Sequence, residues 1–448
     1  MRNLYLTTTL PYVNADPHIG FALELVQADA LARSWLNRGD TVFFNTGTDE
    51  HGQKIFEAAK RSDKDVQEYV DYYANEFRKL KEELGVSDEL KFIRTTDEHH
   101  IQAAQEMWKR CADKGDIYEK EFEGLYCVGC EKYLTQKEII DGKCHIHMVE
   151  PQPLKEKNYF FKLSNYQEKL LEYLDSPNVI VPDWRRVEAI NFIKEGLEDF
   201  SISREKKRLS WGVPVPGDDS QVMYVWFDAL TNYISTLGWP DDGKGDFKKF
   251  WEEGYTLQMA GKDQVRFQSI MWQAMLMSAD IKNTDQIFYH GFINSGGQKM
   301  SKSLGNVISP YELVKKYGTE ATRYLLLRHV HATEDTDVTW ERLDEWYTAG
   351  LVNGIGNLVA RIMKLSEIYN VSRPDNVDVP APSSTLDFEF NVYINSIWNH
   401  VQQLDEHMQK EEPFKRIKTD ESAGMEIIRS LKGGLIDIAH ALAPIMPE

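Results

Sequence analysis

The sequence predicts an α/β fold: a split Rossmann-type nucleotide-binding domain that carries an insertion and is followed by an α-helical bundle. Strand-like and helix-like segments alternate up to about Gly115, which is typical of a parallel sheet covered by helices. The alternation is interrupted at 116–222 and resumes with segments such as Leu257 to Lys262. After about Thr333 the pattern is helical, apart from a linker with Pro and Asp near 373–384.

The first strand, Asn3 to Thr9, leads into a helix start with unusual residues. Asp16 is a good N-cap and Pro17 suits the first helical position. His18-Ile19-Gly20 then open a helix whose apolar face begins at Leu23. A strand followed by a helix N-terminus with a histidine and a close-approach glycine predicts a site for nucleotide phosphates.

A second motif lies about 280 residues further on, where Gly296 and Gly297 precede Lys299-Met300-Ser301-Lys302-Ser303. The run Ile287 to His290 before it is strand-like, and a helix is expected from Ser309. Two lysines on a flexible loop can close on a polyphosphate whose charge grows during a reaction. A solvated basic loop is the simpler alternative for this pentapeptide taken alone.

Three of the four cysteines cluster with a histidine in the pattern Cys-x2-Cys, thirteen residues, Cys-x2-His. The ligands of this zinc knuckle are Cys127, Cys130, Cys144 and His147, whereas Cys111 stands alone. Four protein ligands leave no open position on the metal, so we expect one structural zinc. A set of reduced buried thiols is the alternative.

Composition indicates a large globular enzyme, with 448 residues, 42% hydrophobic residues and a formal charge of −19. Such a charge argues against indiscriminate nucleic-acid binding, so any RNA contact must use local patches such as Arg204 to Arg208 or Lys410 to Lys418. No apolar run approaches the roughly 20 residues of a membrane span, and the N-terminus reads as a core strand. We therefore expect a cytoplasmic protein without a membrane partner.

The two motifs resemble the two signatures of class I aminoacyl-tRNA synthetases, and the whole chain is similar to methionyl-tRNA synthetases. Further segments carry this resemblance in the same order: Leu10-Pro11-Tyr12, Gly47 to Gly52, the zinc knuckle, Tyr224 to Ala229, Gly261-Lys262-Asp263 and Asn357 to Arg361. The insertion is too short for the large editing domain of the leucine, isoleucine and valine enzymes.

The resemblance implies an ATP-dependent ligase that forms methionyl-adenylate and transfers methionine to tRNA(Met), the initiator included. It implies ATP with Mg²⁺, L-methionine and one structural Zn²⁺. We expect a Rossmann catalytic domain in two halves at 1–115 and 223–332, a connective insertion at 116–222 with its knuckle at 124–150, and a helical anticodon-binding domain at 333–448. That last domain is expected to continue beyond Glu448, and a monomer is expected if it does not.

Site residues follow from the same resemblance. Catalytic roles fall on His18, Lys299 and Lys302. ATP is expected at Pro17, His18, Gly20, Gly261, Asp263, Lys299, Met300, Ser301, Lys302 and Ser303. Methionine is expected at Leu10, Tyr12, Asp49, Trp226, Ala229, Tyr233, Gln264, Gln268 and Trp272, an aromatic and aliphatic slot for a thioether in which Asp49 pairs with the ammonium. The anticodon is expected at Asn357, Arg361 and Phe414.

The chain departs from the family's pattern at four of its positions. Phe21 replaces the second histidine of the first signature and offers phosphate no hydrogen bond. Gln268 replaces a histidine beside the methionine slot, where its amide can donate toward the thioether or Tyr12, and Gln264 replaces an aliphatic residue. Phe414 replaces the tryptophan that stacks on the anticodon.

Three other functions fit part of the sequence. A class I synthetase for another small amino acid, such as cysteine, would carry both signatures. A ligase that passes the activated amino acid to a small amine would need no helical domain of more than 100 residues at its C-terminal side. A non-catalytic tRNA-binding paralogue would be expected to lose the lysine loop, which is intact.

Overall fold

The computed structural model describes residues 1–448 except 131, 135, 301–304 and 373–385. Ser301, Lys302, Ser303 and the linker expected at 373–384 therefore lie outside the described residues. The chain divides into two compact units. The first comprises Met1–Pro17, Gly39–Lys79 and Asp88–Tyr289, and the second comprises His18–Arg38, Leu80–Ser87 and His290–Glu448. The finer division into four domains stays a prediction.

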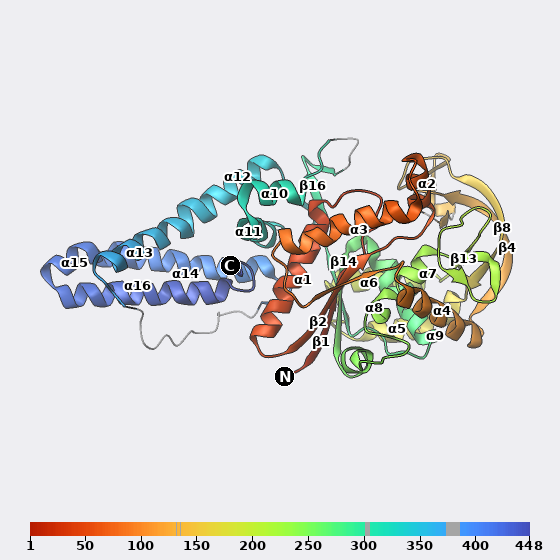
Figure 1. The fold of residues 1–448 in the computed structure, drawn as a ribbon, viewed down its shortest axis with the longest axis horizontal. Helices are drawn as coiled ribbons and strands as arrows, with labels where there is room; N and C mark the ends of the chain where they lie inside the picture. Colours follow the sequence, from red (N-terminus) through yellow and green to blue (C-terminus); the bar gives the residue numbers. More distant parts are fainter. Residues whose placement is uncertain (131, 135, 301–304, 373–385) are drawn as a thin grey trace. The chain divides into compact units, whose positions relative to one another are not determined.

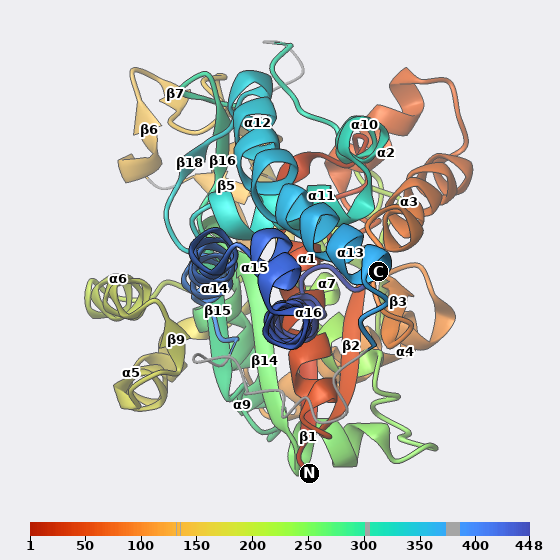
Figure 2. The same cartoon turned by 90° about the vertical axis from the view of Figure 1, so that its left-hand side faces the viewer.

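The first unit is built on a six-stranded sheet in the order β3-β2-β1-β14-β15-β9. Figure 1 labels its strands β1, β2 and β14, and Figure 2 labels all six. Its strands are β1 (Asn3–Thr7), β2 (Thr41–Thr48), β3 (Leu90–Arg94), β9 (Ile180–Val181), β14 (Tyr255–Gly261) and β15 (Gln286–His290). The pairs β1–β2, β2–β3, β1–β14 and β9–β15 are parallel. Leu4 pairs with Tyr255 across the insertion, which confirms that one nucleotide-type sheet is assembled from two separate stretches of the chain.

The carboxyl end of β2 requires a glycine because β3 comes very close to it. A Cβ atom at Gly47 would lie 2.0 Å from the carbonyl oxygen of Ile93 in β3. Only a residue without a side chain lets the two strands pair there, in the register Gly47 to Ile93. Thr48 and Asp49 follow at once and are buried. The close pairing of Gly47 with Ile93 therefore sets the position of Thr48 and Asp49 at the carboxyl end of β2.

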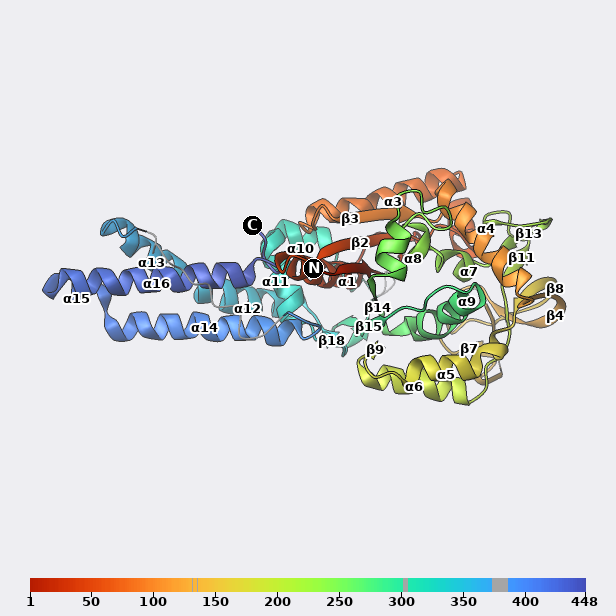
Figure 3. The same ribbon diagram turned by 90° about the horizontal axis from the view of Figure 1, so that it is seen from below.

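Eight α-helices accompany the strands in the described part of the first unit. They are α2 (Gln53–Arg61), α3 (Val66–Glu83, whose last residues belong to the second unit), α4 (Glu98–Asp113), α5 (Gln167–Asp175), α6 (Asp183–Lys194), α7 (Val225–Ala229), α8 (Asn232–Ser235) and α9 (Trp272–Ser278). Figure 3 shows α5 and α6 side by side next to β9. Large buried side chains, among them Trp251, Trp272 and Phe227, form the core of this unit.

The insertion forms an antiparallel sheet in the order β10-β8-β4-β5. The strands are β4 (Ile117–Cys127), β5 (Lys132–Leu134), β8 (Gln152–Phe161) and β10 (Phe200–Ser201). Smaller sheets join β11 (Ser203–Glu205), β12 (Pro214–Val215) and β13 (Asp218–Met223), and β6 (Ile139–Ile140) with β7 (Lys143–Cys144). Arg204 is only 2% exposed and packs against the ring of Tyr224, so it cannot serve the basic surface patch expected at Arg204 to Arg208.

The second unit is mainly helical. It contains α1 (Ile19–Asn37), α10 (Pro310–Tyr317), α11 (Thr319–His329), α12 (Trp340–Tyr347), α13 (Asn357–Ile368), α14 (Phe390–Glu411), α15 (Pro413–Thr419) and α16 (Glu421–Leu442), with the short strands β16 (Ile293–Ser295), β17 (Gln298–Lys299) and β18 (Thr336–Asp337). The long helices α14 and α16 lie side by side, and Figure 2 views both end-on. In the part of the chain that the structure describes, no helix is long and apolar enough to cross a membrane.

A fully buried arginine joins α1, α11, the residue after α3 and the residues after α16 within the second unit. The guanidinium of Arg323 pairs with the buried carboxylate of Asp29, 2.7 Å away. It also donates to the carbonyl oxygens of Leu84, Pro444 and Ile445. A buried charge is tolerated when it is paired and its remaining donors are satisfied, and both conditions hold here.

Stability of the second unit should fall in acid because of His329. Its ring stacks on Trp346 at 4.7 Å, and burial, with the charge of Arg328, lowers the pKa of His329 to about 4. The unfolded value is about 6.5, so this stabilisation is complete above pH 6.5 and is lost as the pH falls toward 4. The difference corresponds to about 3 kcal/mol at most, and partial exposure reduces it to about 1–2 kcal/mol.

The measurement is the unfolding free energy from denaturant titrations at pH 7 and pH 4. His329→Gln should lose less stability between these pH values than the wild type. His407→Gln, which changes an exposed histidine of α14, should behave as the wild type does. An equal loss in all three proteins would contradict the assignment.

Candidate active site

The residues after β1 and β2 meet at the carboxyl edge of the sheet. Tyr12 and Asp49 form a backbone bridge, in which Asp49 N–H donates to Pro11 O at 3.0 Å and Val13 N–H donates to Asp49 O at 3.2 Å. Asp49 is 3% exposed. Ligands of parallel α/β sheets bind at this edge, outside the carboxyl ends of the strands. The two residues, both expected in the methionine slot and Asp49 as the partner of the ammonium, are thus brought together.

Aromatic side chains expected in the methionine slot lie on α7, α8 and α9, and Phe267 lies in the helical segment just before α9. The rings of Trp226 and Phe267 stack at 3.8 Å with an interplanar angle of 12°. Tyr233 and Trp272 are buried and lie 5.7 Å apart. Each contact joins the stretch that contains α7 and α8 to the stretch from Phe267 into α9, so the aromatic residues come from two separate stretches of the sequence. Leu10 and Ala229 are also buried, which suits the apolar lining expected of them.

Gln268 and Trp272 each carry a buried polar atom that has no hydrogen-bond partner among the residues that the structure describes. The amide of Gln268 donates to the hydroxyl of Tyr233 at 2.5 Å, which leaves its oxygen Oε1 as an unpaired acceptor. The indole Nε1–H of Trp272 is an unpaired donor. Buried polar groups are almost always paired, and both atoms belong to residues expected to bind methionine, so we consider them candidates for contact with its polar ends. One N–H of the Gln268 amide is directed at Tyr233, and the amide carries a second N–H, so the expected contact with a thioether or Tyr12 stays a prediction.

The residues after β14 supply a second polar group on the same edge. Gly261 is the last residue of β14, and the turn Lys262–Gln264 follows it. The amide of Gln264 donates to the exposed carboxylate of Asp263 at 3.2 Å. Asp263, which is expected to bind ATP, and Gln264, which is expected to bind methionine, are therefore neighbours directly after β14.

The histidine of the first signature caps helix α1 itself. Its backbone is extended, with φ −120° and ψ 166°, and its Nδ1 accepts from the N–H of Gly20 at 3.1 Å. The prediction that Asp16 caps the helix is wrong. The N-cap is His18, two residues later, and the helix begins at Ile19, so Pro17 precedes the helix. The pKa of His18 is lowered, mainly because neighbouring atoms shield the ring from water and secondly because the ammonium of Lys299 is positively charged. The ring is therefore neutral at pH 7, and because Nδ1 accepts, Nε2 carries the proton and can donate.

The second signature lies near the first within the second unit. Lys299 ends β17 and is close enough to act on the charge of His18, while Ile19 N–H donates to Ile308 O at 3.1 Å, just after the lysine loop. A neutral donor, a helix N-terminus and a lysine thus gather where a polyphosphate would carry its charge. Met300 follows Lys299 at an intermediate exposure, and the rest of the motif lies outside the described residues.

A buried cluster of His51, Asp228 and His100 lies behind the slot and was not assigned from the sequence. Asp228 Oδ2 is 3.1 Å from His51 Nδ1, and Asp228 Oδ1 is 3.3 Å from His100 Nε2. Burial acts to raise the pKa of Asp228, but the imidazoles outweigh it and hold that pKa below its ordinary value. His51 follows Asp49 by two residues, and Asp228 lies between Trp226 and Ala229. The cluster therefore ties two walls of the slot together.

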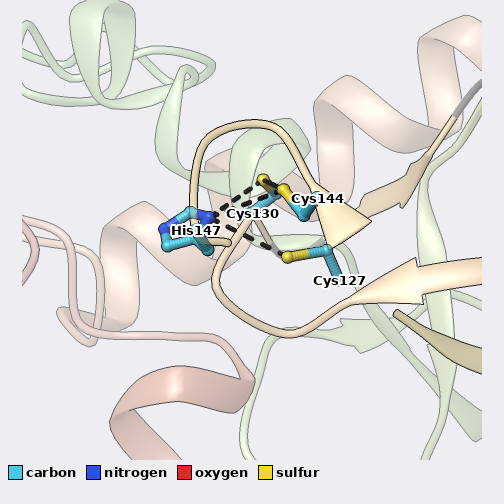
Figure 4. Close-up of side chains that lie close together, drawn as sticks. All are labelled: Cys127, Cys130, Cys144 and His147. Atoms are coloured by element: carbon cyan, nitrogen blue, oxygen red, sulfur yellow. Dashed lines mark hydrogen bonds between the residues drawn. The ribbon is translucent and has the colours of Figure 1, made fainter. Parts of the chain in front are cut away.

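The expected zinc ligands converge in the insertion (Figure 4). The ligand atoms of Cys127, Cys130, Cys144 and His147 all lie within 4.8 Å of one another. Cys130 Sγ is 3.5 Å from Cys144 Sγ and 3.2 Å from His147 Nδ1. Tetrahedral zinc with bonds of about 2.3 Å to sulfur needs ligand separations near ~3.8 Å, so the set fits.

A glycine lets the histidine reach this cluster. A Cβ atom at Gly129 would lie 2.5 Å from Cδ2 of His147, so a side chain there would displace the ring. Cys111 is separate from the cluster and fully buried, and burial raises the pKa of its thiol to about 12. It is therefore a protonated, unreactive cysteine.

The expected anticodon residues are not all in one place. Asn357 lines a cavity of about 260 Å³ between the start of α13 and α14, together with Trp398, Gln402 and Asp405. Arg361 lies one turn further along α13, and its guanidinium pairs with Asp405 at 2.7 Å. Phe414 is 42% exposed at the start of α15 and does not line this cavity.

Fold and site together define a class I synthetase, and comparisons with known proteins agree. The model of the family "tRNA synthetases class I (M)" matches residues 4–152 and 130–363. A methionine–tRNA ligase of Fusobacterium nucleatum is 37% identical and covers 100% of this chain and 73% of its own, and one of Thermosynechococcus vestitus is 38% identical over 99% and 88%. The chain belongs to the methionine–tRNA ligase family.

A solved structure agrees with this assignment. Methionyl-tRNA synthetase of Mycobacterium tuberculosis in complex with methionyl-adenylate superimposes with a TM-score of 0.91 at 34% identity, over 100% of this chain and 92% of that one. The predicted fold class, family and enzyme class are thereby confirmed. The roles of individual site residues stay predictions.

Proposed function

We propose that the protein activates L-methionine with ATP to methionyl-adenylate and then transfers the methionyl group to the 3′ end of tRNA(Met), the initiator included. The observation that carries this proposal is the group of buried residues Tyr233, Gln268 and Trp272, in which aromatic rings adjoin an indole N–H and an amide oxygen without a hydrogen-bond partner among the described residues. An unbranched thioether fills an aromatic slot well, while its amino and carboxylate ends need polar partners. The family assignment supports the same substrate.

In the first step, a carboxylate oxygen of methionine forms a bond to the α-phosphorus of ATP, and the bond from that phosphorus to the bridging oxygen of pyrophosphate breaks. His18 donates from Nε2, and Lys299 stabilises charge on the phosphate oxygens, a role that we also assign to Lys302. Mg²⁺ accompanies ATP. In the second step, a terminal ribose hydroxyl of the tRNA attacks the adenylate and AMP leaves.

The test is amino-acid-dependent ATP–pyrophosphate exchange with each of the twenty amino acids. Methionine should give the fastest exchange. Fastest exchange with cysteine or another small amino acid would replace the substrate and keep the enzyme class. Exchange with methionine but no transfer to tRNA would favour a ligase that uses a small amine.

One zinc ion per chain fits the proposed function as a structural element. Cys127, Cys130, Cys144 and His147 would hold it, and zinc when bound would supply a fixed tetrahedral link between β4 and the end of β7. Its ligand set is complete without water, so we assign it no part in the chemistry.

Recognition of tRNA should depend on Arg361. Arg361→Ala should lower kcat/KM for tRNA by about 1–3 kcal/mol, the worth of one good base contact, and should leave pyrophosphate exchange near the wild-type rate. Aminoacylation of a tRNA with a CAU anticodon measures the first quantity. Lys364→Ala, which removes the same charge from the same helix, is the control. Equal damage to both assays would indicate a folding defect and leave Arg361 without an RNA role.

A further inference from the structure

The ammonium of Lys299, the first lysine of the second signature, lies over the ring of Phe292. Its Nζ is 5.1 Å from the ring centroid, within the roughly 6 Å over which the negative face of an aromatic ring attracts a cation. Phe292 directly precedes β16, and Lys299 is the last residue of β17. Phe292 belongs to neither signature, and the sequence assigns it no role.

A tight hairpin places the lysine beside this ring. Strands β16 and β17 pair antiparallel, with Asn294 opposite Lys299. Gly296 and Gly297 form the turn between them, and both have the positive φ that a type I′ hairpin turn requires, 64° and 73°. Phe292 lies two residues before Asn294, so the ring and the ammonium meet diagonally across the hairpin, at a separation that aromatic and long side chains can span.

The backbone of Phe292 is held on both sides by the segment between α11 and α12. Its N–H donates to the carboxylate of Asp335 at 3.0 Å, and its carbonyl oxygen accepts from the N–H of Thr336 at 2.9 Å. The preceding residue, Gly291, has no room for a side chain, because a Cβ atom there would lie 2.2 Å from the carbonyl oxygen of Glu334. The ring therefore stands on a fixed backbone, in contrast to the long, exposed lysine side chain that it contacts.

The ammonium needs an attractive partner because its surroundings are electropositive before ATP binds. The N-terminus of α1, which His18 caps, carries partial positive charge. Lys299 is close enough to His18 for its charge to oppose protonation of the imidazole. The face of Phe292 attracts the ammonium without bringing a full negative charge. A carboxylate in the same place would repel the phosphates that the lysine is expected to meet.

We propose that Phe292 is a positioning residue for the reaction: it holds the ammonium of Lys299 beside His18 before ATP binds, ready for the charge that develops on the phosphate oxygens. The proposal rests on the proposed function, which assigns Lys299 to that charge. A group that is already in place costs no reorganisation at the moment of reaction, and preorganised groups stabilise a transition state for this reason. In this role Phe292 touches no reacting atom and acts only through the lysine.

The experiment changes the charge distribution of the ring and keeps its shape. Phe292→trifluorophenylalanine, introduced by codon suppression, replaces ring hydrogens with fluorine and so weakens the negative face. We expect kcat/KM for ATP in methionine-dependent pyrophosphate exchange to fall by about three- to tenfold, the worth of one contact between a cation and a ring. Phe292→Tyr keeps the negative face and should stay near the wild-type value. The same fluorinated residue at Phe92 of β3, whose ring carries the guanidinium of Arg78 at 4.8 Å, should change nothing.

Two further readouts separate positioning from a purely structural role. In a Lys299→Ala background, the fluorinated ring at position 292 should cause no further loss, because its effect passes through the ammonium that is absent. The second readout is an NMR titration of ligand-free protein with isotope-labelled histidine. The fluorinated ring should raise the pKa of His18, as Lys299→Ala also should, since an ammonium that moves away no longer opposes protonation.

Each result has a distinct meaning. A loss confined to proteins that retain Lys299, with the wild-type value kept in Phe292→Tyr, would support the proposal. An unchanged kcat/KM for ATP, an unchanged pKa of His18, or a further loss in the Lys299→Ala background would overturn it. A wild-type rate in Lys299→Ala would remove Lys299 from the proposed function and the role of Phe292 with it. Absence of methionine-dependent exchange in the wild type would contradict the activation step, whereas the His18 titration would still decide whether the ring holds the ammonium.

Discussion

Replacing His18 with alanine is expected to slow methionine-dependent ATP–pyrophosphate exchange by about 100-fold or more. The neutral imidazole has its Nδ1 engaged by Gly20 N–H, so its Nε2–H is oriented as a donor. Loss of one preorganised donor to developing charge typically costs about 10²–10³ in rate. Phe21 cannot compensate, because its ring offers no donor. The measurement is the exchange rate at saturating methionine and ATP.

The matched control is His18→Ser, since alanine also removes the cap of α1. A serine hydroxyl can accept from the Gly20 N–H and restore the roughly 1 kcal/mol that a lost N-cap costs. The serine variant should therefore regain the thermal stability of the wild type and stay as slow as the alanine variant. An exchange rate within threefold of the wild type in either variant would show that His18 is a cap only.

Loss of one zinc ligand should remove the metal and unfold the insertion. Cys130→Ser takes away the sulfur that lies 3.5 Å from Cys144 Sγ and 3.2 Å from His147 Nδ1. Structural zinc sites in small peptides contribute about 10–16 kcal/mol of folding free energy, so the remaining three ligands should not hold the segment. The parallel sheet of the first unit should survive because its core is made by other residues. Elemental analysis and proteolysis at residues 124–150 measure the two effects.

Cys111→Ala is the control for that experiment, because it removes a buried thiol that lies outside the cluster. It should retain one zinc per chain and the wild-type resistance of the insertion. Protein purified without chelator that contains no zinc would contradict the metal assignment altogether.

Local sequence patterns were sufficient to predict the features that depend on residues close together in the chain. The spacing of Cys127, Cys130, Cys144 and His147 predicted a cluster because short spacings keep ligands together whatever the rest of the fold does. The strand before His18 and the helix after it were likewise confirmed. The cap was misassigned because Asp16 is a better N-cap by preference, whereas the backbone that places His18 at the cap is fixed by the tertiary fold.

Features that join distant residues could not be predicted in this way. His51 and Asp228 are 177 residues apart, and nothing in the spacing of either indicates the other. Gln268 was expected to offer a donor toward the thioether or Tyr12, and only the packed structure shows that one of its amide N–H groups is directed at Tyr233. Side-chain pairing across the fold depends on which elements are neighbours, and single-sequence periodicity carries no such information.

The buried cluster of His51, Asp228 and His100 sets a limit on redesign of the enzyme for unnatural amino acids. Removal of one partner from a buried charged group typically destabilises a protein by about 3–5 kcal/mol, a large part of the total for a domain. Libraries that enlarge the slot should therefore vary Leu10 and Tyr233 and leave Asp228 fixed. A variant that accepts a bulkier side chain through changes around Asp228 would be expected to need a compensating replacement of both histidines at once.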